Sequence, residues 1–99
     1  MTALMNHPVP PYPYLIQVAK HYPQATSTYL ELWRVKDRKH KVTITKNEIR
    51  NKFLIGAAKF RNDVFSLAQE GLVSVNETWD VNQTEWYKLD IELVNFEEE

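Results

Sequence analysis

The sequence predicts one α+β domain in which short helices pack on a small antiparallel sheet. Three observations lead to this prediction. Before Gly71, apolar residues mostly recur at the three- and four-residue spacing of amphipathic helices. Closer to the C-terminus they alternate with polar residues, as they do in strands. The chain has 99 residues, and the 43% that are hydrophobic suffice for one modest core.

Residues 1–13 are predicted to form a proline-rich arm. They contain four of the five prolines, each of which fixes φ and removes a backbone donor, so an extended path is expected rather than a regular helix. The arm is expected to be frayed or to lie on the core as a strap, and the alternative is an arm that binds a partner or embraces a dimer. Residues 14–22 are expected to form a short helix, although part of this segment also fits a strand.

Residues 24–35 are predicted to form the first helix of the domain. Pro23 suits the first turn of such a helix. Tyr29, Leu32 and Trp33 recur at helical spacing, and Trp33 is expected to anchor the core. After a polar basic connection, Val42-Thr43-Ile44 alternates and is rich in β-branched residues, so it predicts a short strand.

A pair of helices follows. Thr45 and Glu48 have the spacing of a capping box, so a helix is expected to begin just after Thr45. Ile55-Gly56 then marks a tight turn. A second helix is predicted over about 57–70, and it ends at Gly71, a common helix stop.

The C-terminal third is predicted to form a β-hairpin. Residues 72–79 and 86–96 read as strands, and the turn-rich segment 80–85 joins them. Trp79 and Trp86 flank the turn and are expected to pair across the hairpin. Residues 97–99 form a short acidic tail. In the second strand four side chains are expected to point inward: Tyr87, Leu89, Ile91 and Leu93.

The helix pair and its exit resemble the winged helix-turn-helix superfamily. The resemblance rests on apolar residues at Ile49, Phe53, Ile55, Phe60 and Val64, followed by Gly71-Leu72-Val73, and it covers about residues 23–94. It implies a three-helix core with a small antiparallel sheet and wing over residues 14–96, extended by a short N-terminal helix. In this superfamily Ser or Thr often opens the second helix, so Gly56 lacks a phosphate-contacting hydroxyl.

Charge is segregated along the chain although the net charge is only −1. Residues 34–61 contain ten basic and two acidic residues, whereas residues 62–99 contain one basic and ten acidic residues. This pattern favours a polyanion-binding face with an acidic back. The alternative is a solvated basic loop.

The basic helix pair predicts a double-stranded DNA interface. The N-terminal part of a recognition helix contacts base edges in the major groove, while cations around it hold the phosphates. Arg61 and Asn62 have side chains that match guanine and adenine edges. The expected base-contacting residues are Ala57, Ala58, Lys59, Arg61 and Asn62. The expected backbone-contacting residues are Lys39, Lys41, Lys46, Arg50, Lys52 and Gly56.

Catalysis, metals and cofactors are not expected. The chain has no cysteine and two glycines, which excludes disulfides, thiolate metal sites and a glycine-rich phosphate loop. No export signal or membrane-spanning run is present, so a cytoplasmic protein is expected. The predicted function is sequence-specific DNA binding, as a transcriptional regulator or a small replication or plasmid-type initiator module. A homodimer is expected, because dimers read two half-sites.

The rival interpretation is a winged helix that binds protein through its wing. Asp80 and Glu85 bracket the tip of the hairpin, and no Lys or Arg lies between them. Such a tip would repel phosphate, so we expect the wing to contribute little to DNA binding. Trp79 and Trp86 would then serve a protein partner.

Overall fold

A computed structural model of the chain describes residues 9–53 and 55–94. These residues form an α+β fold with four α-helices, one short 3₁₀ helix and three antiparallel strands, which confirms the predicted class. The helices are α1 (Tyr12–His21), η2 (Pro23–Ala25), α2 (Thr26–Val35), α3 (Lys46–Phe53) and α4 (Ala57–Gln69). The strands are β1 (Lys41–Thr45), β2 (Val73–Trp79) and β3 (Trp86–Leu93).

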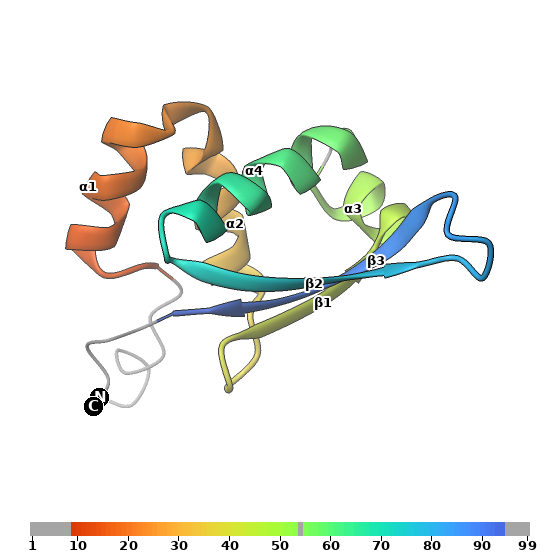
Figure 1. Cartoon of the computed structure of the whole chain (residues 1–99). Helices are drawn as coiled ribbons and strands as arrows, with labels where there is room; N and C mark the ends of the chain where they lie inside the picture. The colour runs from red at the N-terminus through yellow and green to blue at the C-terminus, as the bar shows by residue number, and fades with distance from the viewer. Residues whose placement is uncertain (1–8, 54, 95–99) are drawn as a thin grey trace.

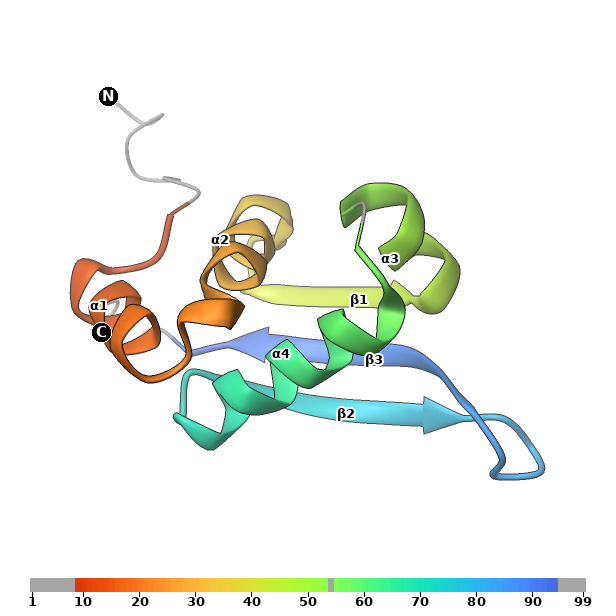
Figure 2. The same cartoon turned by 90° about the horizontal axis from the view of Figure 1, so that it is seen from above.

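The helices cover one face of the sheet (Figure 1). The strand order is β1-β3-β2, so the hairpin strand β3 lies in the centre and pairs with both neighbours. Seen from above, α4 crosses the sheet towards β2, and α3 lies at the end of β1 (Figure 2). The largest fully buried side chains between the layers are Tyr29, Phe60, Leu32, Ile44, Ile49, Leu67, Leu89 and Ile91.

The N-terminal helices begin at different places than expected. Helix α1 begins at Tyr12, inside the range assigned to the extended arm, because a proline in the first helical turn removes a donor that the turn does not use. The first turn after Tyr22 is the 3₁₀ helix η2, and α2 starts only at Thr26. Residues 1–8 of the predicted arm lie outside the described residues.

The start of α3 confirms the predicted capping box. The backbone N–H of Thr45 donates to Oε1 of Glu48 over 2.9 Å, and the backbone N–H of Glu48 donates to Oγ1 of Thr45 over 3.2 Å. Each side chain thereby satisfies an amide that has no partner within the helix.

The end of α4 confirms the stop at Gly71. Gly71 has a φ of +76°, and its N–H donates to the carbonyl of Ala68 over 3.0 Å. The N–H of Leu72 reaches the carbonyl of Leu67 over 3.1 Å, so the two bonds form a Schellman motif with a buried Leu67–Leu72 contact. This motif turns the chain directly into β2.

One expectation for β3 is wrong, since Tyr87 is 46% exposed instead of pointing inward. The strand register pairs Thr78 with Lys88 but Trp79 with Trp86, which leaves Tyr87 as an extra residue. Such a bulge inverts the alternation, so Trp86 packs against the core in its place. The Trp79–Trp86 pairing is confirmed. The strand ends at Leu93, and Phe96 lies outside the described residues.

Candidate nucleic-acid interface

Only some of the residues of α4 that were expected to contact bases face outward. Ala58 and Asn62 are exposed and lie one helical turn apart. Ala57 is only 8% exposed, so its expected outward position is wrong. It lies three residues before Phe60 and seven before Val64, and this spacing puts it on the core-facing side of the helix. Gly56 is the exposed N-cap residue, so the first amides of α4 have no side-chain cap.

The Lys59 side chain is half exposed, but its ammonium contacts partners within the chain. Its Nζ lies 2.6 Å from Oδ2 of Asp63 and donates to the carbonyl of Gln24 over 3.0 Å. Asp63 is 4% exposed and also accepts a hydrogen bond of 2.7 Å from Oγ1 of Thr28. A buried carboxylate needs such donors. Lys59 therefore joins α4 to η2, while Asp63 joins α4 to α2. The expected base contact from Lys59 does not fit this geometry.

Arg61 lies at the hairpin side of α4. Its guanidinium forms an ion pair with Glu77 of β2 and stacks over Phe65, with 4.7 Å between Cζ and the ring centroid. Nε1 of Trp79 donates to the same carboxylate over 3.1 Å. The Arg61 guanidinium, assisted by the Trp79 indole, holds the pKa of Glu77 below its ordinary value. Arg61 is thus a neutralised cation and not a free one.

Lys46 of α3 also contacts the hairpin. Its Nζ lies 2.8 Å from Oε1 of Glu85 and 4.9 Å from the ring centroid of Trp86. Cζ of Arg61 lies 5.9 Å from the same ring, so Trp86 receives one cation from each of the two helices. We call these five residues, Lys46, Arg61, Glu77, Glu85 and Trp86, the Trp86 cluster.

Two expected phosphate-contacting residues remain available on α3. Arg50 and Lys52 are exposed and form no ion pair with any described residue. Arg50 lies one turn after Lys46 and shares its face of the helix, beside the Trp86 cluster. Lys52 lines a different feature, a groove of about 290 Å³ between α2 and α3 that has Phe53 and Ile55 in its wall.

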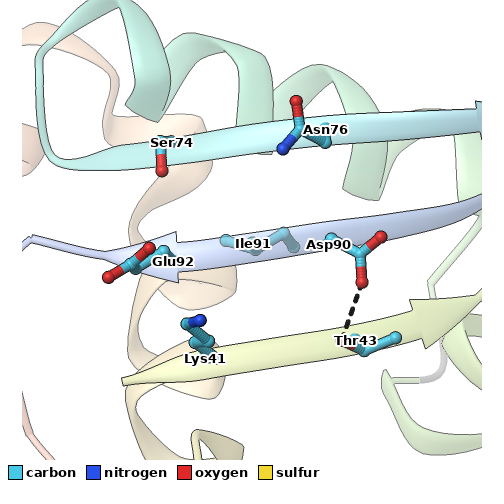
Figure 3. A pocket seen from close by; sticks show the side chains of 7 residues that line it. All are labelled: Lys41, Thr43, Ser74, Asn76, Asp90, Ile91 and Glu92. Carbon is cyan, nitrogen blue, oxygen red and sulfur yellow. Dashed lines mark hydrogen bonds between the residues drawn. The ribbon is translucent and has the colours of Figure 1, made fainter. Parts of the chain in front are cut away.

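The other two expected phosphate contacts lie elsewhere. Lys39 precedes β1 and Lys41 is the first residue of that strand, whose five residues span about 13 Å before α3 begins (Figure 2). Their backbone N–H groups donate to Oδ1 of Asp37 over 2.8 and 2.9 Å. The side chain of Lys41 lines the outer face of the sheet (Figure 3). The structure therefore does not bring Lys39 and Lys41 together with Lys46 and Arg50.

The outer face of the sheet contains a shallow hollow of about 370 Å³ (Figure 3). Asp90 accepts a hydrogen bond of 2.8 Å from Oγ1 of Thr43, and Glu92 lies across from Lys41. Polar side chains line most of this surface, as expected where an antiparallel sheet exposes one face to water. Its two carboxylates make it a poor surface for nucleic acid.

Sequence reasoning missed the acidic partners in the Trp86 cluster. Glu77 is 16 residues from Arg61, and Glu85 is 39 residues from Lys46. No local sequence pattern therefore predicts either ion pair. The Lys59–Asp63 pair did have a signal, because the two residues are four apart on one helix.

In the described ranges no three His, Asp or Glu side chains gather where a metal ion could bind. None of the described helices is both long and apolar enough to cross a membrane. No family model, curated protein or solved structure matches the chain.

Proposed function

We propose that this chain is a winged-helix domain that binds double-stranded DNA, without catalysis, through α3 and the N-terminal half of α4. The element order α2–β1–α3–α4–β2–β3 supports the proposal, as does the pairing of β1 with the hairpin strand β3. The observation that carries it is the exposure of Arg50, Ala58 and Asn62 beside the uncapped start of α4.

Each of these groups has a role that its chemistry suits. Asn62 has an amide that can pair with both the N6 and N7 positions of adenine. Ala58 is small, so the helix can approach the groove closely. Arg50, which is unpaired within residues 9–53 and 55–94, supplies a guanidinium for a phosphate. The first amides of α4 offer further donors to the backbone of DNA.

Titration of a fluorescent duplex across a salt series tests the proposal. We expect Arg50→Ala to weaken binding to all sequences and to lower the salt slope by about one. Asn62→Ala should weaken a selected preferred site more than random DNA. Lys20→Ala is the matched control, because Lys20 is an exposed cation on α1, at the other end of the molecule (Figure 1). Equal losses for Arg50→Ala and Lys20→Ala would contradict the assignment of this face.

Protein binding at the hairpin is the second candidate function. Three apolar side chains there are exposed: Trp79 by 36%, Val81 by 94% and Tyr87 by 46%. Exposed apolar groups that gather on one projection favour a protein contact. Sedimentation at rising concentration tests whether the partner is a second copy. A Val81→Ser/Tyr87→Ser variant should then stay monomeric where the wild-type chain associates.

A further inference from the structure

Both cations of the Trp86 cluster are held by carboxylates of the hairpin. Lys46 belongs to α3 and Arg61 to α4, whereas Glu77 and Glu85 belong to β2 and the β2–β3 turn. The hairpin projects past the helices at the α3 end of the molecule, so it lies beside the proposed DNA face (Figure 1). Carboxylates therefore already occupy cations that phosphates would otherwise contact.

The two ion pairs differ in how firmly they are held. The side chains of Arg61 and Glu77 are 31% and 14% exposed, and each has a second contact, with Phe65 and Trp79 respectively. The Lys46 side chain is 21% exposed, but the Glu85 side chain is 70% exposed, and among the described residues its carboxylate contacts Lys46 alone. Ion pairs with a carboxylate this open to water are weak and are easily exchanged.

We propose that Glu85 competes with DNA phosphate for Lys46, and that Arg61 stays paired with Glu77 on binding. This inference rests on the proposed function and specifies how the same site is regulated. The ammonium of Lys46 lies over the Trp86 ring, so it can exchange one oxygen anion for another without leaving the aromatic face. Arg61 acts as a positioning residue that fixes α4 against β2.

The exchange has a thermodynamic consequence. A cation that neutralises one phosphate releases counterions and adds about 0.9 to the salt slope of the binding constant. When Lys46 leaves Glu85 for a phosphate, the freed carboxylate attracts a cation from solution. The two effects oppose each other, so the Lys46 contact adds less to the slope in the wild-type chain than an unpaired lysine would.

Removing the charge of Glu85 should therefore strengthen the contact between Lys46 and DNA phosphate and make it measurable. With random duplex DNA, we expect Glu85→Gln to bind about two- to fivefold more tightly, the range set by one weak surface ion pair. The salt slope should become steeper, by at most about 0.9. A Lys46→Ala/Glu85→Gln double variant should lose both gains, because Glu85 is proposed to act through Lys46.

Glu92→Gln is the matched control, since it makes the same change in net charge on the outer face of the sheet. Thermal unfolding of each variant verifies that the fold is intact. Equal gains for Glu85→Gln and Glu92→Gln, or no gain for Glu85→Gln, would overturn the competition while DNA binding stands. If none of the proteins binds DNA at low salt, the proposed function fails and this inference fails with it.

Discussion

At the scale of single residues, helix α2 buries two polar groups without hydrogen-bond partners among the described residues. These groups are the Tyr29 hydroxyl and the Trp33 indole N–H. Tyr29 is fully buried, and burial raises its pKa to about 12. The Trp33 indole lies near the hydroxyl without hydrogen-bond geometry and opposes this rise of the pKa to a smaller extent. A buried donor without a partner costs stability, whereas an apolar group of the same shape does not.

Tyr29→Phe is therefore expected to keep the stability of the fold or raise it by up to about 1 kcal/mol. The pKa of Tyr29 is higher in the folded chain than in the unfolded chain. The contribution of the neutral Tyr29 side chain to the free energy of unfolding is thus complete below pH about 10, and it is lost as the pH rises towards 12. Urea unfolding at neutral and alkaline pH measures both effects. A large loss of stability at neutral pH would show that the hydroxyl has a partner after all.

Asp63 is the buried acid that joins two helices. Asp63→Ala would leave the Thr28 hydroxyl without its acceptor, and Lys59 would keep only its hydrogen bond to the carbonyl of Gln24. We expect the free energy of unfolding to fall by about 1–3 kcal/mol. Asn62→Ala, an exposed change on the same helix, is the control and should stay within about 0.5 kcal/mol. Equal effects of the two substitutions in chemical denaturation would contradict the role given to Asp63.

At the scale of the secondary-structure elements, the two glycines have different tasks. A Cβ at either position would meet no atom within 4 Å, but Gly71 has a φ of +76° whereas Gly56 has a φ of −68°. Gly71→Ala is expected to lower the free energy of unfolding by about 1–2 kcal/mol, because the left-handed conformation strains an L-residue. Gly56→Ala should change it far less. Unfolding midpoints in urea that fall equally for both would show that the Schellman turn is not required.

Local signals explain which elements could be predicted. The capping box at Thr45 and the stop at Gly71 are determined by residues within a few positions of each other, and the sequence was sufficient for both. The bulge that turns Tyr87 outward depends on how two strands pair, and a strict alternation could not reveal it. The inward position of Ala57 did have a local signal, because Ala57 lies three residues before Phe60 and seven before Val64 and so shares their face of α4.

At the scale of the whole molecule, the basic segment 34–61 does not form one continuous face. Lys41 lines the outer side of the sheet, and Lys59 points towards a buried acid. The hairpin neutralises Lys46 and Arg61, while Arg50 stays unpaired among the described residues. Counting charges along the sequence could locate the basic segment. It could not foresee contacts with acids 16 and 39 residues away.

The proposed DNA face and the outer sheet face can be separated by observing backbone amides while a short duplex is added to an isotope-labelled chain. If α3 and α4 bind DNA, the amide signals of Arg50, Gly56, Ala58 and Asn62 should shift most, and the shifts should diminish as salt is raised. The amides of Thr43, Ser74 and Asp90, on the outer face, should stay in place. Shifts confined to the outer face, or no shifts at low salt, would contradict the proposed function.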